Sequence, residues 1–439
     1  MPLRLDAGAA DFEAALGALL LAKRERGADV DAAVAKIIAD VRARGDKALV
    51  ELTRRYDRVE LATGGPMTMR QRPLRLPATW LDDVESQCEA DALEALAFAA
   101  ERITAYHRRQ MPQDLDYVDA AGVRLGARWR ALDSVGVYVP GGTAAYPSTV
   151  LMNVLPAKVA GVPRIAMVVP PGGCHPLVLA AAKLAGVDEI YGIGGAQAVA
   201  ALAFGTESIR PVDKIVGPGN AYVAAAKRRV FGAVGIDMIA GPSEVLVVAD
   251  RANDPAWIAA DLMAQAEHDE AAQSILMTDD ADFGTRVTEA VESTLAELPR
   301  KAIAAESWRR HGAIILVPDL HEVAALVDRL APEHLQLAIE HPDALALKVR
   351  HAGAIFLGRY TPEAIGDYVG GPNHVLPTSG SARFSSGLGA LDFLKRTSLL
   401  SCDAASLAAL GPAAMTLARA EGLDAHALSI AIRLNLPRG

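Results

Sequence analysis

The chain has 439 residues, half of them hydrophobic, with a formal net charge of -9 and a pI near 5.6. This composition predicts an ordered globular protein with a large buried interior. The acidic balance argues against nucleic acid or an anionic membrane as partner, because both require a basic protein face. Three cysteines without a CxxC pair indicate a reducing compartment. With no signal-peptide pattern and no apolar run near the ~20 residues of a membrane span, we expect a soluble cytoplasmic protein.

Residues 1–110 are expected to form a helical N-terminal region, packed in part on the second α/β domain. Apolar residues recur at helical spacing in Val30–Val41 and Ala92–Ile103. A segment with Gly and Pro, from Thr63-Gly-Gly-Pro66 to Pro77, separates these helices. Residues prone to β structure then flank Gly122, which predicts a hairpin linker over residues 111–133.

Residues 134–240 repeat one pattern four times: an apolar β run, a Gly-rich turn and a helical stretch. This alternation predicts a parallel sheet whose carboxyl edge collects the turns, and that edge is where α/β sheets bind ligands. The expected strands are Val135–Val139, Ile165–Val169, Glu189–Tyr191 and Lys214–Val216, and the turns are Pro140-Gly-Gly142, Pro171-Gly-Gly173, Gly192-Ile-Gly-Gly195 and Gly217-Pro-Gly219.

Residues 241–390 continue the alternation and are expected to form a second α/β domain. Its expected strands are Ser274–Met277, Ala313–Val317 and Ala354–Leu357. Asp319 and Glu322 match an N-terminal capping box for a helix over Val323–Leu330. Residues 391–439 predict two helices separated at Gly422, too short to bury a core and therefore expected to dock elsewhere. The fold class is α/β, with two incomplete Rossmann-like parallel-sheet domains and helical N-terminal and C-terminal extensions.

A possible nucleotide signal follows the third predicted strand of the first sheet. Gly192, Gly194 and Gly195 precede a helix, which suits phosphate groups at a helix N-terminus. The last glycine of the GxGxxG fingerprint is replaced by Gln197. Ordinary βα turns explain this motif alone equally well, but several such turns on one edge favour a nucleotide or another large anionic ligand.

A second set of residues has the donor types of a metal site. Asp254 and Pro255 match a helix start, and continuing that helix places Gln265 and His268 one turn apart on one face. A hydrogen-bonded Gln and a helix-end His would explain this pair in isolation. Asp367 and His374 stand in a glycine-dense loop with little packing value, and His426 lies near the start of the last helix. Nitrogen and oxygen donors without sulfur suit Zn²⁺ or Mn²⁺.

Glu333 and His334 are candidates for acid–base chemistry. They follow Ala331-Pro332, where the preceding helix must end or bend. An imidazole can take a proton from a hydroxyl near neutral pH, and the adjacent carboxylate can activate water. A His at a helix start, bonded to the backbone, is the structural alternative. The other six histidines lie in polar or cap-like contexts and are interpreted as surface or structural: His107, His175, His311, His321, His341 and His351.

In order along the chain, these motifs resemble histidinol dehydrogenases over essentially the full length. One such motif would be weak, whereas the complete ordered set is highly specific. The matching segments are Val137–Gly142, Gly194–Ala198, Gly217–Asn220, Ala240–Glu244, Gln265–His268, Ala331–Leu335, Gly366–Tyr368, Asn373–Pro377, Phe384–Gly387, Asp392–Thr397 and Glu421–His426.

The resemblance implies a homodimeric enzyme that uses NAD and one Zn²⁺ per subunit to oxidise L-histidinol to L-histidine, through a bound aldehyde, in histidine biosynthesis. Glu333 and His334 match the catalytic acid–base pair. The implied metal ligands are Gln265, His268, Asp367 and His426; the implied substrate contacts are these four with Ser243, His334, His374 and Glu421; the implied NAD contacts are Tyr138, Gln197 and Asn220. His426, and with it Glu421, is expected to come from the partner subunit.

Three other functions share parts of this pattern. A related enzyme on the same scaffold would oxidise another small alcohol, but it would not need Glu421 and His374 together. A zinc hydrolase would leave the glycine-rich edge of the first sheet without a use. A metabolite sensor that does not catalyse would have no need of both Glu333 and His334.

Overall fold

The computed structural model describes residues 2–21, 28–63, 71–141, 145–239 and 241–437. Their contacts define two compact units. Unit 1 contains residues 1–109 and 133–393, and unit 2 contains residues 110–132 and 394–439. The five-part division expected from the sequence remains a prediction, because these contacts group the chain at a coarser level. The turn residues Gly64–Pro66 and Gly142 lie outside the described residues.

The first sheet of unit 1 is parallel throughout, and over the described residues it has five strands in the order β10-β9-β6-β7-β8. All four expected strands are present, and the bounds of β8 and β9 match the expectation. β6, β7 and β8 are buried along their whole length, as in sheets covered on both faces. The strands are β6 (Val135–Tyr138), β7 (Ile165–Val168), β8 (Glu189–Tyr191), β9 (Lys214–Val216) and β10 (Gly235–Ile236).

Helices that follow the strands cover this sheet, joined by three N-terminal helices. The N-terminal helices are α2 (Ala28–Arg44), α3 (Asp46–Tyr56) and α4 (Ala90–Arg108); α2 packs on α7 and α8, and α4 packs on α5 and α6. The helices between strands are α5 (Pro147–Ala160), α6 (Pro176–Ala185), α7 (Gly195–Phe204) and α8 (Ala221–Val230). Between α3 and α4 lie the short elements β2 (Glu60–Ala62), β3 (Gln71–Pro73), η1 (Ala78–Leu81) and η2 (Val84–Gln87).

The second sheet of unit 1 is also parallel, with six strands over the described residues in the order β1-β13-β12-β11-β14-β15. The three expected strands are β12 (Gln273–Thr278), β13 (Ala313–Leu316) and β15 (Ala354–Leu357). Three strands were not predicted: β1 (Leu3–Asp6), β11 (Glu244–Ala249) and β14 (His334–Ala338). The helix-start alternative for His334 is therefore wrong, because His334 is the first residue of a central strand.

The helices around the second sheet are α1 (Phe12–Leu21), α9 (Pro255–Ala266), α10 (Ala281–Glu297), α11 (Lys301–His311), α12 (Ala324–Leu330), α13 (Pro342–Ala346) and α14 (Glu363–Tyr368). Asp254 caps α9 through the Ala256 N–H, as expected. Asp319 caps the 3₁₀ turn η4 (Leu320–Glu322) through the His321 N–H, and α12 begins only at Ala324. The expected capping box is therefore wrong in detail. Two further 3₁₀ turns, η5 (Ser381–Arg383) and η6 (Ala390–Phe393), follow α14.

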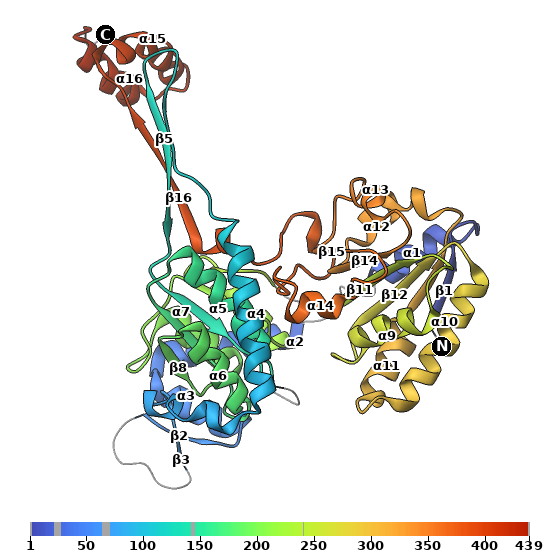
Figure 1. Cartoon of the computed structure of the whole chain (residues 1–439). Helices are drawn as coiled ribbons and strands as arrows, with labels where there is room; N and C mark the ends of the chain where they lie inside the picture. Colours follow the sequence, from blue (N-terminus) through green and yellow to red (C-terminus); the bar gives the residue numbers. More distant parts are fainter. Residues whose placement is uncertain (1, 22–27, 64–70, 142–144, 240, 438–439) are drawn as a thin grey trace. The chain divides into compact units, whose positions relative to one another are not determined.

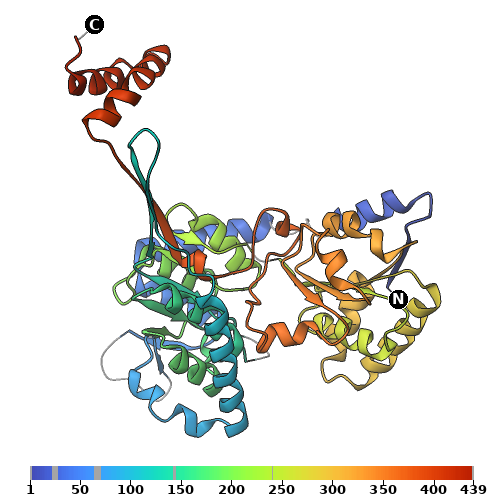
Figure 2. The same ribbon diagram turned by 45° about the horizontal axis from the view of Figure 1, so that its top comes forward.

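Unit 2 combines an antiparallel sheet with a helical pair. The expected hairpin is formed by β4 (Leu115–Val118) and β5 (Arg124–Ala131), and β5 also pairs with β16 (Leu394–Ser401). Figures 1 and 2 show β5 and β16 side by side as a long ribbon that leads to α15 (Ala404–Ala420) and α16 (Asp424–Ala431). A last turn, η7 (Ile432–Leu434), follows α16. The prediction of two helices separated at Gly422 is confirmed, but β16 was missed at the start of that region.

Across the described residues, the structure contains no helix both long enough and apolar enough to cross a membrane.

Candidate active site

The candidate catalytic pair lies at the amino edge of the second sheet. α12 ends at Ala331, whose left-handed φ of 43° turns the chain through Pro332 into β14. His334 is then paired in register with Val245, one residue inside the amino end of the neighbouring strand β11. Glu333, which precedes the strand, accepts a hydrogen bond at Oε2 from the Glu244 N–H at 2.9 Å. Both candidate side chains are thus fixed where the two central strands begin.

The protonation state of His334 follows from its surroundings. Its Nδ1 lies 3.0 Å from the Glu244 carbonyl oxygen, which can only accept, so Nδ1 carries the hydrogen. Burial lowers the pKa of His334 to about 4, against the opposing effect of the Asp367 charge. Nε2 is therefore an unprotonated acceptor at neutral pH, and it has no hydrogen-bond partner among the described residues.

Helix α14 brings two carboxylates next to His334. Glu363 and Asp367 are four residues apart and so lie on one helical face. Glu363 Oε1 is 3.4 Å from His334 Nδ1, and Asp367 Oδ1 is 3.8 Å from Nε2. One ligand-type atom from each of these three residues lies within 4.8 Å of the other two. This cluster is a possible metal-binding group.

The charges in this cluster are unfavourable without a cation or a proton. Burial raises the pKa of Glu363 well above its usual value, and the negative charges of Asp367, Glu333 and Asp261 raise it further. Burial also raises the pKa of Asp261 to about 6, although the Gln336 amide donates to it at 2.7 Å. Because several carboxylates share a poorly solvated space, a bound cation would stabilise them all.

Gln265 and His268 lie near the end of α9. Gln265 is fully buried, and its amide oxygen and nitrogen both lack hydrogen-bond partners within the described part of the chain. The helix ends at Ala266, so His268 is exposed in the turn that follows, with its N–H bonded to the Gln265 carbonyl. The expectation that one helical face carries both donors is therefore wrong. His268 is nevertheless near the cluster, because its charge affects the pKa of His334 and of His374.

Of the other expected substrate contacts of unit 1, His374 borders the same cluster, and Ser243 directly precedes Glu244. His374 Nδ1 donates to the Asp367 carbonyl oxygen at 2.9 Å, and its Nε2 is 3.5 Å from the Thr149 hydroxyl. Burial lowers the pKa of His374, so its neutral form is favoured. Ser243 directly precedes β11 and is partly exposed, and its carbonyl accepts the Gln273 N–H at 2.9 Å.

The donor set fits zinc. A fully buried amide whose oxygen and nitrogen both lack hydrogen-bond partners costs folding free energy unless a ligand binds those atoms. The Gln265 amide is buried and unpartnered in this way in the described structure. Imidazole nitrogen and carboxylate or amide oxygen are suitable zinc donors. Gln265, His268 and Asp367 of unit 1 carry atoms of these types.

The expected cofactor residues lie at the carboxyl edge of the first sheet. The strand order reverses between β6 and β9, and open α/β sheets bind ligands at such a switch point. Tyr138 ends β6, and its hydroxyl accepts the Gly195 N–H at 3.0 Å at the start of α7. Gln197 is buried, and its side chain lies close to Gly195. A Cβ added to Gly195 would be 2.8 Å from the Oε1 of Gln197. Asn220 caps α8 through the N–H groups of Tyr222 and Val223.

Two expected site residues belong to unit 2. Glu421 is the C-cap residue of α15, and His426 lies in the first turn of α16. Both are exposed. Their participation in the cluster of unit 1 therefore stays a prediction.

One member of the cluster, Glu363, and one neighbour, Asp261, were not identified from the sequence. Each stands four residues before an expected ligand on the same helix, Glu363 before Asp367 and Asp261 before Gln265. That i, i+4 spacing is the signal that could have found them.

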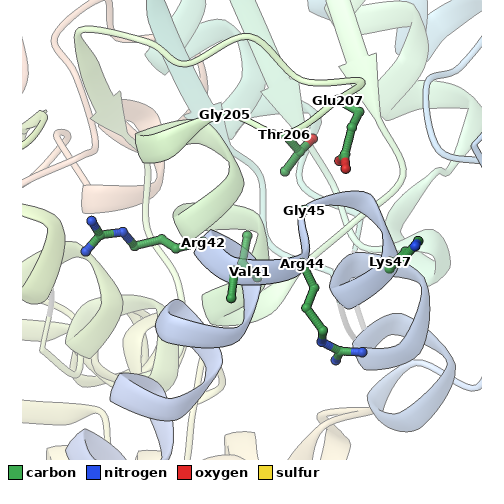
Figure 3. A pocket seen from close by; sticks show the side chains of 9 residues that line it. Val41, Arg42, Arg44, Gly45, Lys47, Gly205, Thr206 and Glu207 are labelled. Carbon is green, nitrogen blue, oxygen red and sulfur yellow. The ribbon is translucent and has the colours of Figure 1, made fainter.

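A separate pocket of about 480 Å³ lies among the end of α2, the start of α3 and the loop after α7 (Figure 3). Its charged groups serve structural contacts. Arg42 stacks on Phe204, Arg44 pairs with Asp40, and Glu207 accepts the Asp46 N–H at the start of α3. We assign no catalytic role to this pocket.

Comparison with known proteins identifies the family. The family model described as histidinol dehydrogenase matches residues 21–434. The histidinol dehydrogenase of Rhodospirillum rubrum is 64% identical over 438 residues, covering 99% of both chains. That of Ruegeria pomeroyi is 62% identical over 441 residues, covering 100% of both. The crystal structure of histidinol dehydrogenase from Elizabethkingia anophelis superimposes with a TM-score of 0.92 at 34% identity, covering 99% of this chain and 98% of that one.

These matches span the two parallel sheets, the cluster at the amino edge of the second sheet and the switch point of the first. The chain therefore belongs to the histidinol dehydrogenase family, NAD-dependent oxidoreductases that use zinc and oxidise histidinol to histidine in histidine biosynthesis.

Proposed function

We propose that His334 is the base that takes the hydroxyl proton of L-histidinol. The observation that carries this proposal is the fixed tautomer of the imidazole: Nδ1 donates to the Glu244 carbonyl at 3.0 Å, so Nε2 has a free lone pair. With its pKa lowered to about 4 by burial, His334 is neutral at pH 7, so Nε2 is unprotonated when the substrate binds.

Glu333 is proposed to activate the water that converts the aldehyde to the acid. Its carboxylate is held by the Glu244 N–H, so it is already oriented next to His334. Oxidation of the alcohol yields an aldehyde with no net gain of oxygen, so the second step needs water. Addition of that water gives a hydrate, whose oxidation produces the carboxylate. A carboxylate within the same buried cluster can take the water's proton while the reactive aldehyde stays sequestered.

Gln265, His268 and Asp367 are proposed to hold one zinc per subunit, with His426 of the partner subunit as the fourth ligand. When bound, zinc would orient the amine and imidazole of the substrate and neutralise the surrounding carboxylates. The unpartnered amide of Gln265 and the three-residue cluster of His334, Glu363 and Asp367 support a cation at this place. Ser243, His374 and Glu421 are proposed to complete the contacts with the substrate.

Tyr138, Gln197 and Asn220 are proposed to bind NAD at the switch point of the first sheet. NAD, when bound, accepts a hydride in each of the two oxidations. The place of these residues at the end of β6 and at the starts of α7 and α8 supports this assignment. Gln197 occupies the position of the missing fingerprint glycine, and it is buried against Gly195.

The active form is proposed to be a homodimer in which unit 2 reaches the partner. α15 has 17 residues, but the buried core of the helical pair consists of Met415, Ala418, Ala427 and Ala431. Large apolar side chains on this unit are exposed instead: Leu399, Leu400, Leu417, Leu428 and Ile432. A second copy of the chain would cover them, and exposed apolar patches of this kind mark protein interfaces.

The expected location is the cytoplasm. Cys88, Cys174 and Cys402 are all free thiols in the described structure, which fits a reducing compartment.

The experiment that tests these assignments counts NADH formed per L-histidinol at 340 nm, with zinc-loaded protein and excess NAD⁺. We expect two NADH per histidinol for the unaltered chain and none for His334→Asn in the same time. A single NADH, with aldehyde released to solution, would contradict the proposal that one buried site carries out both oxidations.

A further inference from the structure

A buried ion pair lies beside the proposed cofactor site. Lys227 of α8 and Asp237, directly after β10, pair with each other, with side chains 2% and 1% exposed. Withdrawing two charges from water is costly, so a pair of this kind must be compensated by close geometry and further hydrogen bonds. The proposed chemistry of histidinol oxidation assigns no role to it.

Both members of the pair bind the same residue, Gly217. Asp237 Oδ2 accepts the Gly217 N–H at 2.8 Å, and Lys227 Nζ donates to the Gly217 carbonyl at 2.9 Å. The second carboxylate oxygen of Asp237 accepts the Met238 N–H at 2.6 Å. Every backbone polar group of Gly217 is therefore fixed by this pair.

Gly217 holds an unusual backbone position at the switch point. Its φ is 110°, a conformation that residues with a side chain rarely adopt. A Cβ on Gly217 would lie 2.2 Å from the carbonyl oxygen of Tyr138, so the turn after β9 passes directly against the end of β6. Three residues further on, Asn220 caps α8. The path of the chain from Gly217 sets where Asn220 stands relative to Tyr138.

We infer that Lys227 and Asp237 are positioning residues that hold the turn over residues 217–220 in the conformation that binds the dinucleotide. This inference rests on the proposed cofactor site. Neither side chain needs to touch the cofactor, since both are buried and act through the Gly217 backbone. Fixing the turn before binding reduces the conformational entropy that NAD binding must offset, which raises affinity without changing the chemical step.

The test compares the steady-state constants of Lys227→Met with those of the unaltered enzyme. Loss of the Lys227–Asp237 pair should raise KM for NAD about tenfold, which corresponds to about 1.4 kcal/mol of binding free energy. The kcat should change less than about twofold, and KM for histidinol should not change. The dissociation constant for NAD⁺, measured by calorimetry without substrate, should rise in parallel. Arg228→Met is the matched control, because it removes a long cation from the neighbouring, exposed position of the same helix.

A second variant covers the case in which Lys227→Met does not fold because Asp237 is left unpaired. The double variant with Lys227→Met and Asp237→Asn removes both charges and retains an amide oxygen for the Gly217 N–H. It should fold and still show the raised KM for NAD. An unchanged KM for NAD in a folded variant would overturn the inference. A rise in KM for histidinol as large as the rise in KM for NAD would overturn it too.

Asn220→Ala separates this inference from the proposed cofactor site. A raised KM for NAD in Asn220→Ala, together with an unchanged value in Lys227→Met, would overturn only the positioning role of Lys227 and Asp237. Unchanged values in both variants would show that the cofactor site itself is wrongly placed, and the positioning role would be overturned with it.

Discussion

The two parallel sheets of unit 1 share a topology, but their proposed sites lie at opposite edges. In the first sheet, the strand order reverses between β6 and β9, and Tyr138 and Gly217 meet at the carboxyl ends of those strands. In the second sheet, the order reverses between β11 and β14. Its candidate catalytic residues, Glu333 and His334, lie at the amino end of β14 instead.

The side chains at the second switch point explain this difference. At the carboxyl ends of β11 and β14, the Arg359 guanidinium binds both oxygens of Asp250, at 2.8 and 2.6 Å. The Asn253 amide donates to the Ala338 carbonyl at 2.7 Å. These groups are bonded to one another at the carboxyl ends of the two strands, the place where a parallel sheet commonly receives a ligand. Topology therefore marks the places where a site could form, and the side chains decide which of them is available.

The largest expected effect comes from removing the base at the amino edge. His334→Asn should lower kcat about 10³-fold, within the range for loss of a general base, with a small change in KM for NAD. Stopped-flow measurement of the first hydride transfer checks this. His341→Asn, at an exposed histidine, serves as control. If His334→Asn kept more than a tenth of the activity, the catalytic role of the amino edge would be wrong.

Acid should weaken the metal-free protein through His334. Burial lowers its pKa from 6.5 to about 4, so between these values the unfolded chain binds more protons than the folded one. Stability should therefore fall as the pH falls from 6.5 towards 4, by about 3 kcal/mol from this group. Urea unfolding of the chain and of His334→Asn, at pH 7 and pH 4.5, measures the difference. A pH dependence identical in the two proteins would contradict the buried neutral state of His334.

The two oxidation steps should respond differently to a change at Glu333. Glu333→Gln keeps an oxygen for the Glu244 N–H but removes the base for water. We expect the oxidation of added aldehyde to slow about 100-fold and that of histidinol to aldehyde about tenfold or less. Single-turnover rates for each half-reaction test this division, and equal losses would refute it.

The smallest expected effect is at the Asp250–Arg359 pair, at the carboxyl edge of the second sheet. Asp250→Asn weakens the pairing with Arg359, and both side chains are about three-quarters buried, at 23% and 25% exposed. We expect a loss of about 1 kcal/mol in unfolding free energy with unchanged kcat and unchanged KM for NAD and histidinol. An altered KM for NAD would mean that this edge binds the cofactor after all.

The sequence predicted the first sheet better than the second for a physical reason. β8 and β9 each end directly before a glycine-rich turn, and their predicted bounds match the structure. β14 directly follows Pro332 and Glu333 and begins with His334, so the start of a buried strand was not recognised there. β16 is exposed along most of its length and carries Lys395 and Arg396, so it lacks the apolar alternation of a buried strand.

The site was predictable to the extent that its residues occur in motifs. Glu333, His334 and Asp367 were identified from such motifs, and the structure brings them together. Glu363 stands four residues before Asp367, and that spacing was not used; its burial beside other carboxylates became visible only in the structure. His268 was placed on a helix that ends two residues earlier, since helix ends are the least certain part of any prediction from sequence.

The use of opposite edges is tested most directly by a crystal structure of the chain with NAD⁺ and zinc, with anomalous scattering recorded at the zinc edge. We expect the anomalous peak beside Gln265 and Asp367 at the amino edge of the second sheet. The dinucleotide should lie against Tyr138 and Asn220 at the carboxyl edge of the first. A zinc peak or a dinucleotide beside Asp250, at the carboxyl edge of the second sheet, would contradict this account.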